Sequence, residues 1–170
     1  MKKVAIMLTM FLALSLSKNT SAQGTIVDVA VGNEDFSTLV TALTAADLVS
    51  ALQADGPFTV FAPTNEAFSK IDSKALANLL KEENKKALSN ILTYHVVSGK
   101  LAASDVVAAL KKGNGSVDLT ALNGQVINVM QKDGKIWLKD QNDNYSEIIA
   151  TDVMASNGVI HVIDTVVMPN

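Results

Sequence analysis

The stretch Phe58-Thr-Val-Phe-Ala-Pro-Thr-Asn-Glu-Ala-Phe68 decides how this chain folds. Its apolar, aromatic beginning is typical of a short β-strand, and Pro63 stops that strand because proline cannot donate to a sheet ladder. Thr64 or Asn65 can then cap a helix that begins with Glu66. The stretch therefore predicts a strand, a stop and a helix start in immediate succession.

A second informative segment lies near the other end of the chain, Asn157-Gly-Val-Ile-His-Val-Ile-Asp-Thr-Val-Val-Met-Pro169. Asn157-Gly158 favours a tight turn, and the β-branched residues that follow favour a strand. A third feature, Tyr94-His95, lies between the two segments. Together the three features closely resemble the signature segments of the fasciclin-domain family, in the order that family requires.

The resemblance to the fasciclin family extends from about Thr25 to Pro169, which is nearly the whole chain. It implies an α+β fold, in which helices pack around a compact wedge of β-sheet. It also implies an adhesive function, because most of the family is adhesive. The residues that carry the resemblance are explained mainly as strand, turn and core positions, so they identify a fold more than a binding site.

The chain begins with the pattern of an export signal. Lys2 and Lys3 precede an apolar run over residues 4–16, and Thr20-Ser21-Ala22 offers the small residues of a cleavage site. The apolar run is shorter than the ~20 residues that span a bilayer. We therefore predict a signal peptide over residues 1–22 and a single fasciclin domain over residues 23–170. We expect this domain to be secreted, in the periplasm or on the cell surface if the source is bacterial, and not to insert in the membrane.

Composition narrows the class of partner. The chain has no cysteine, so an exported domain must be held together by packing alone. Three of its 14 cationic residues lie in the predicted leader, which leaves 11 lysines against 17 acidic residues and a formal charge of −6. Nucleic acids and anionic lipids attract clustered positive charge, so neither is an expected partner.

Periodicity divides the chain into a helical first half and a strand-rich second half. Apolar residues at helical spacing predict helices over about residues 36–52, either two short helices or one long helix over 76–92, and one helix over 102–110. Asp47 is a candidate cap within the first of these regions. Strands are expected over residues 126–130, 136–138, 146–154 and 159–168, with a tight hairpin turn at Asp133-Gly134. This order favours α+β architecture over alternating α/β.

The inventory of catalytic groups is poor, and we predict that the protein is not an enzyme and uses no cofactor. It has no thiol, no nucleophile elbow and no phosphate-binding glycine loop. Its two histidines, His95 and His161, both lie in apolar stretches. Together with Asp152 or Asp164 they could bind zinc or serve a hydrolase, but they lack a short ligand spacing. Structural histidines are the favoured interpretation, and no metal site is predicted.

The acidic stretch Asp140-Gln-Asn-Asp-Asn144 begins like a calcium-binding loop, with oxygen donors at alternate positions. It departs from that pattern because Tyr145 stands where the loop needs glycine and Thr151 where it needs an acid. A polar turn between two strands is the favoured explanation.

Tyr94-His95 is the first candidate for an adhesive surface. In family members that bind cell-surface integrins, a tyrosine-histidine pair between bulky aliphatic residues is regarded as part of that surface. Here Ile91 and Leu92 precede the pair, and Val96 and Val97 follow it. The resemblance thus implies a binding role for Tyr94 and His95. The alternative, which we favour, is that the phenol and imidazole hydrogen-bond the backbone at a corner between a helix and a strand.

Asp152 and Val153 form the second candidate. The stretch Asp152-Val153-Met154 is similar to an integrin motif proposed for animal relatives, with Asp-Ile shortly before the Asn-Gly turn. A carboxylate there could complete the coordination of a metal ion held by the partner. The alternative is a solvated strand residue.

These features predict a secreted, non-enzymatic module for cell adhesion or interaction with the extracellular matrix. The expected partner is a cell-surface or matrix protein or a glycan. A single domain is a weak cross-linker, so self-association could supply the avidity that adhesion needs. The alternative function is a periplasmic or extracellular carrier of a small ligand, held in an apolar cleft between sheet and helices, or an accessory binding protein.

Overall fold

The computed structural model describes residues 23–170, and the predicted signal peptide lies outside the described residues. The helices are α1 (Ile26–Val31), η1 (Glu34–Phe36), α2 (Ser37–Ala45), α3 (Val49–Gln53), α4 (Asn65–Ser69), α5 (Ser73–Leu79), η2 (Glu82–Asn84), α6 (Lys85–Tyr94) and α7 (Ala103–Lys112). The strands are β1 (Phe58–Pro63), β2 (Val96–Ser98), β3 (Ser116–Thr120), β4 (Val126–Lys132), β5 (Lys135–Lys139), β6 (Tyr145–Ala155) and β7 (Gly158–Ile163). None of the helices in residues 23–170 has the length and apolar character needed to cross a bilayer.

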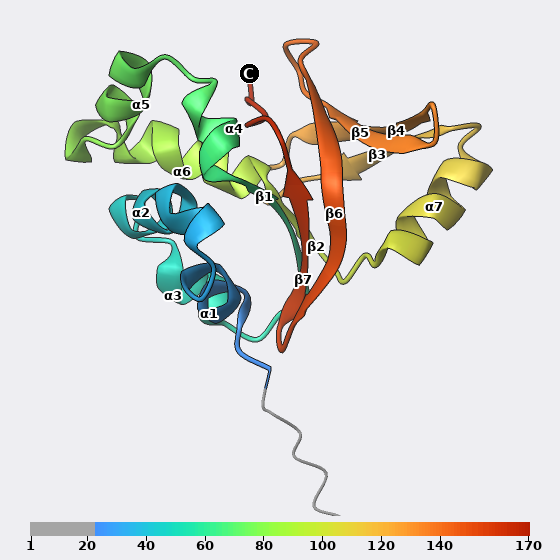
Figure 1. The fold of residues 1–170 in the computed structure, drawn as a ribbon, viewed down its shortest axis with the longest axis horizontal. Helices are drawn as coiled ribbons and strands as arrows, with labels where there is room; N and C mark the ends of the chain where they lie inside the picture. Colours follow the sequence, from blue (N-terminus) through green and yellow to red (C-terminus); the bar gives the residue numbers. More distant parts are fainter. Residues whose placement is uncertain (1–22) are drawn as a thin grey trace, which may run out of the picture.

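The seven strands form one strongly curved sheet in the order β2-β1-β7-β6-β5-β4-β3 (Figure 1). The two signature segments lie side by side in it, because β1 pairs with β7 in parallel and Phe61 is opposite His161. The other strand pairs are antiparallel. The two edge strands nearly meet through a bridge between Val97 and Ala121. The sheet is therefore close to a barrel, which leaves little free edge.

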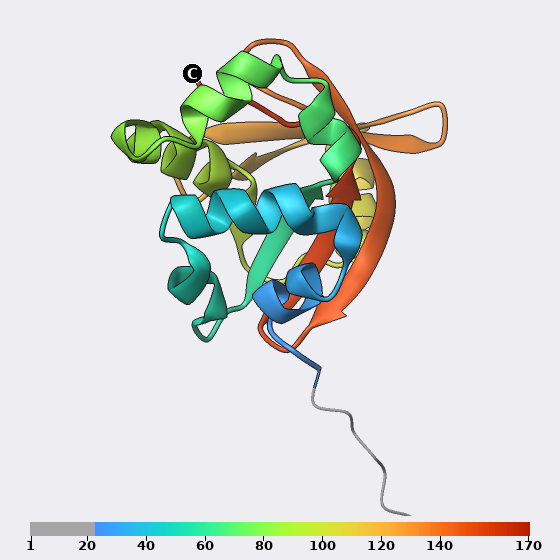
Figure 2. The same ribbon diagram turned by 60° about the vertical axis from the view of Figure 1, so that its left-hand side comes forward.

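Helices cover the two sides of this sheet unequally. Helices α1 to α6 gather on one side of β1 and β7, whereas α7 lies on the other side near β3, β4 and β5 (Figures 1 and 2). The α1–α6 layer buries a first core, which includes Phe36, Leu39, Leu88 and Ile160. The observed α+β wedge with packed helices confirms the expected fold class.

A second core fills the inside of the curved sheet. It contains Phe61 and Ile163 from the central strands, Ile127 and Leu138 from β4 and β5, and Leu110 from α7, all fully buried. Because strand side chains alternate between faces, the neighbours of these inward residues on β4 and β5 must point away from this core.

The structure confirms the strand-stop-cap interpretation of the first signature segment. The strand β1 ends at Pro63, and the Thr64 side chain accepts a hydrogen bond from the N–H of Ala67 at 3.2 Å. The predicted hairpin turn is also present, since Asp133 and Gly134 both have positive φ angles, 54° and 76°. Such angles are the signature of a type I′ turn.

Several expected boundaries are corrected. Asp47 does not cap α3, because the N-cap of that helix is Leu48. The φ of Asp47 is 61°, and its carboxylate pairs with Lys85 at 3.1 Å. The last strand ends at Ile163 rather than Met168. The elements α1 and β3 were not anticipated, because they are only 6 and 5 residues long.

The Asn157-Gly158 turn proves to be a junction of three segments. The Asn157 side chain donates to the carbonyl groups of Leu52 and Ala54 at 2.7 and 2.9 Å, and accepts from the N–H of Ile26 at 2.9 Å. A Cβ on Gly158 would lie 2.1 Å from the carbonyl oxygen of Phe58, so only glycine fits there. The second signature segment is thus fixed by packing as well as by turn geometry.

Candidate functional site

Tyr94 lies at the end of α6 with its ring inside the second core, and none of its surface is exposed. Its hydroxyl donates to the carbonyl of Val126 at 2.9 Å. Burial is the main cause that raises the pKa of this hydroxyl above its ordinary value. Tyr94 therefore joins α6 to β4 and presents no side chain to a partner.

His95 is buried beside Tyr94 and hydrogen-bonded through both ring nitrogens. Nδ1 lies 2.8 Å from the carbonyl oxygen of Ile91, and Nε2 accepts from the N–H of Val167 at 3.3 Å. These contacts place the proton on Nδ1. Desolvation by burial lowers the pKa of His95 to about 4, so the ring is neutral near neutral pH.

The contacts of this pair support the structural alternative. Tyr94 and His95 hold the corner between α6 and β2 through backbone hydrogen bonds. The expectation that they lie on an exposed adhesive surface is corrected by their burial.

Asp152 occupies an irregular part of β6, where the pairing with β7 shifts register between Ala150 and Val153. Its φ is 59°, and its carboxylate accepts from the N–H of Ala103, the first residue of α7, at 2.8 Å. The side chain is nevertheless exposed, whereas Val153 is partly buried against the first core. Asp152 thus has a structural task, and a binding role for Asp152 and Val153 stays a prediction.

His161 completes this junction from β7. Its Nδ1 accepts from the backbone N–H of Asp152 at 3.4 Å, so Nε2 carries the proton and donates to the carbonyl of Leu101 at 2.7 Å. Both nitrogens of both histidines therefore contact the backbone. Among residues 23–170, no group of three acidic or histidine side chains is arranged to hold a metal ion.

The acidic stretch at 140–144 is organised by N–H donors. The buried carboxylate of Asp140 accepts from the backbone N–H of Asn142, Asn144 and Met168 at 2.8, 2.9 and 3.0 Å. The side-chain amide of Asn144 also donates to it at 3.0 Å. A carboxylate surrounded by donors in this way holds a turn, which agrees with the favoured explanation of the stretch.

A different surface has the character of a binding site, on the outer face of β4, β5 and β6. Val129 and Leu138 point into the second core, so their neighbours Met130 and Trp137 point outward. These two residues are directly opposite one another across β4 and β5. Tyr145, at the start of β6, is 49% exposed on the same side.

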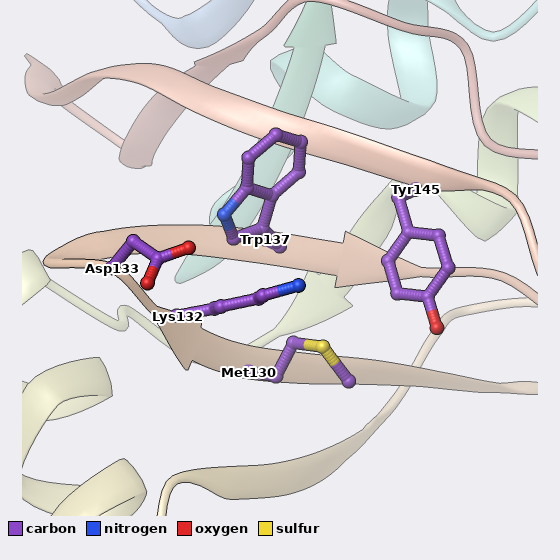
Figure 3. Close-up of a pocket in the computed structure, with 5 residues that line it drawn as sticks. All are labelled: Met130, Lys132, Asp133, Trp137 and Tyr145. Atoms are coloured by element: carbon purple, nitrogen blue, oxygen red, sulfur yellow. The ribbon is translucent and has the colours of Figure 1, made fainter.

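Five residues of this surface enclose a pocket of about 310 Å³: Met130, Lys132, Asp133, Trp137 and Tyr145. We call them the aromatic face. In Figure 3 the Lys132 side chain runs between Trp137 and Met130, with its ammonium group directed toward Tyr145. Asp133, from the hairpin turn, lies at the other end. The pocket thus combines two aromatic rings, a thioether, one cation and one anion.

Most charges around the aromatic face are already paired. Lys135 pairs with Glu147 at 2.8 Å, and Lys139 pairs with Asp143 at 2.6 Å. The Asp143 carboxylate raises the pKa of Lys139 through that contact. Lys132, in contrast, makes no ion pair with any of residues 23–170. The pocket therefore contains one cation, Lys132, and one anion, Asp133, that make no ion pair with any of residues 23–170.

The architecture is that of a known fold. The structure is similar to the FAS1 domain pair of the insect cell adhesion molecule fasciclin I, with a TM-score of 0.73 and 21% sequence identity. The match covers 84% of this chain and 50% of that one, so this chain spans about half of its length.

A family model for the fasciclin domain matches residues 34–169, and the chain belongs to the fasciclin-domain family. It is 49% identical over 150 residues to Protein sll1483 of Synechocystis sp., covering 88% of this chain and 76% of that protein. It is 38% identical to transforming growth factor-beta-induced protein ig-h3 of Sus scrofa, covering 88% of this chain and 20% of that protein. The family assignment confirms the resemblance seen in the signature segments.

The aromatic face was missed by sequence reasoning. The run Ile136-Trp137-Leu138 is apolar throughout, which conceals the fact that Trp137 points away from its neighbours. The available signal was positional: in a strand, the residue between two core residues faces outward. Tyr145 was considered only as a departure from a calcium loop.

Proposed function

We propose that this chain is an exported, non-enzymatic module for cell adhesion or interaction with the extracellular matrix, and that it binds through the aromatic face. The observation that carries the proposal is the group of partly buried Trp137 and Met130 and exposed Tyr145 around one pocket on the outer face of the sheet. Tryptophan, tyrosine and methionine are enriched at the centres of protein interfaces. A surface pocket of apolar groups with a few polar ones is also the usual form of a ligand site.

Family membership supports the class of function. A solved structure with the same fold belongs to a cell adhesion molecule. The engagement of both histidines by the backbone supports a non-enzymatic role, because it leaves neither ring available as a general base. The export signal predicted over residues 1–22 supports a location outside the cytoplasm.

The proposed partner is a cell-surface or matrix protein or a glycan. The formal charge of −6 beyond the predicted leader argues against nucleic acid. One binding face on one domain cannot bridge two surfaces, so adhesion would need self-association or many copies on a surface.

The carrier alternative has less support. The apolar space between α5, α6 and the chain end, lined by residues such as Phe68, Leu76 and Leu88, measures only about 10 Å³. That volume is close to the space needed by one water molecule. An apolar ligand could therefore enter this space only if α5 moved.

A screen of purified residues 23–170 against cells, glycans and matrix proteins tests the proposal. We expect binding, and we expect the double variant Trp137→Ser, Tyr145→Ser to abolish most of it without changing the circular dichroism spectrum. No binding by the wild-type protein across the screen would refute the adhesive function. Undiminished binding by the double variant would refute the location of the site.

The second predicted site, Asp152 and Val153, can be tested separately. Asp152→Asn keeps an oxygen acceptor for the N–H of Ala103 and removes the charge. A loss of binding in this variant at unchanged stability would support a role for the Asp152 carboxylate. Unchanged affinity would remove Asp152 from the binding surface.

A further inference from the structure

We infer that the pocket of the aromatic face binds a sugar unit that carries a carboxylate, such as a uronic acid within an extracellular polysaccharide. The inference rests on the proposed function, since it names the ligand class of the same face. It is carried by the combination of two outward-facing aromatic rings, one of them half-buried, with one lysine that has no ion-pair partner among residues 23–170, in a pocket of about 310 Å³.

The walls of the pocket suit the ring of a sugar. A pyranose presents C–H groups on one face and hydroxyl groups around its edge, so it packs well on an aromatic ring that remains partly solvated. Trp137 and Tyr145 offer two such rings on a rigid sheet, and Met130 supplies an adaptable apolar contact between the strands. The volume of about 310 Å³ accommodates a single ring and its substituents.

The charge of Lys132 indicates which substituent the bound sugar carries. Lys135 and Lys139 already have carboxylate partners, whereas Lys132 has none among residues 23–170. A ligand carboxylate would complete this set by pairing with the Lys132 ammonium group. Hydrogen bonds between charged groups are about twice as strong as neutral ones, so this contact would dominate recognition.

The surroundings favour one carboxylate over a dense polyanion. Asp133 lines the same pocket and can only accept hydrogen bonds at neutral pH, which suits sugar hydroxyl groups and repels further anions. The formal charge of −6 beyond the leader also repels densely sulfated chains. A sugar with one carboxylate and several hydroxyl groups satisfies both Lys132 and Asp133.

Trp137 provides a direct measurement, because it is the only tryptophan in the chain. Its fluorescence therefore reports solely on this pocket. We would titrate the purified protein with methyl galactopyranosiduronic acid, a sugar with a single carboxylate, and with its methyl ester, which keeps the ring and removes the charge. We expect a saturable change in emission with the acid and roughly ten- to hundredfold weaker binding of the ester.

Two variants make the assignment specific. Lys132→Gln should weaken binding of the acid by roughly ten- to hundredfold and leave binding of the ester unchanged. Lys135→Gln is the control, because it removes one positive charge from the same hairpin at a lysine that is already paired with Glu147. This variant should bind the acid with the affinity of the wild type. Circular dichroism would verify that both variants are folded.

Two results would overturn the inference. One is the absence of any fluorescence change up to about 10 mM of the acid, beyond the range of ordinary weak binding. The other is equal binding of acid and ester. Neither result refutes the proposed function, which the binding screen tests separately. If the Trp137→Ser, Tyr145→Ser variant loses adhesion in that screen, the aromatic face still binds a partner, but one of a different chemical class.

Discussion

The carboxylate of Asp152 accepts a hydrogen bond from the backbone N–H of Ala103 at 2.8 Å. This contact joins the irregular part of β6 to the first turn of α7. The backbone N–H of Asp152 reaches His161 in turn, so one residue links three segments of the second half of the chain. Its φ of 59° lies in the left-handed region, which aspartate and asparagine tolerate better than most residues.

We predict that Asp152→Ala lowers the free energy of unfolding by about 1–3 kcal/mol. The variant loses the hydrogen bond to Ala103 and places a residue with lower left-handed preference at a positive φ. Asp152→Asn should stay close to the wild type, because it keeps both the acceptor and the backbone preference. Urea denaturation measures both variants, and equal stability of Asp152→Ala and wild type would contradict the assigned role.

Gly158 supports a second prediction about the Asn157-Gly158 turn. Gly158→Ala should prevent native folding or lower the free energy of unfolding by more than about 3 kcal/mol, because its Cβ would lie 2.1 Å from the carbonyl oxygen of Phe58. Gly124→Ala serves as the matched control, since Gly124 has a φ of 83° but open space around it. We expect this control to cost about 1 kcal/mol, from backbone strain alone. Thermal melts of both variants would show the contrast, and similar melting temperatures would refute the steric argument.

His95 predicts a specific pH dependence of stability. Its pKa falls from the ordinary 6.5 to about 4 in the folded protein, mainly because burial disfavours the charged ring. Between these values the unfolded chain binds the proton and the folded chain does not, so stability falls as the pH is lowered. The full contribution is present above about pH 6.5, and about 3 kcal/mol is lost by about pH 4.

The variant His95→Gln isolates this effect, because glutamine does not titrate. Urea denaturation at several values between about pH 7 and pH 4 would give the difference in unfolding free energy between wild type and variant. We expect the wild type to lose its advantage as the pH falls. A difference that stays constant over the whole range would mean that His95 is not buried as a neutral ring.

The sequence predicted the fold well because local signals and long-range packing agree at the signature segments. Phe58-Thr-Val-Phe-Ala-Pro63 reads as a strand, and the same residues form an interior strand of the sheet, between β2 and β7. Asn157-Gly158 reads as a turn, and its close contact with Phe58 requires glycine as well. Asp47 shows the opposite case. Its residue type signals a helix cap, yet its backbone adopts a positive φ before Leu48 and its exposed carboxylate pairs with Lys85, which no short-range pattern reveals.

The candidate site was harder to predict than the fold, because the burial of its residues does not follow from their polarity. Tyr94 and His95 are polar enough to suggest a surface, yet every polar atom of their side chains finds a backbone partner inside the protein. Trp137 and Tyr145 have the opposite property, since they are aromatic but face outward. Their convergence depends on the register of β4, β5 and β6, which places residues from three strands around one pocket.

The most direct test of the adhesive function compares two surface variants against a partner found in the binding screen. Tyr145→Ala alters the aromatic face, whereas Val31→Ala truncates another exposed hydrophobic residue, on α1 in the separate helical layer. We predict that Tyr145→Ala weakens binding by roughly tenfold or more, as expected for an aromatic hot spot, and that Val31→Ala binds like the wild type. Equal affinities of the two variants would contradict the assignment of adhesion to the aromatic face.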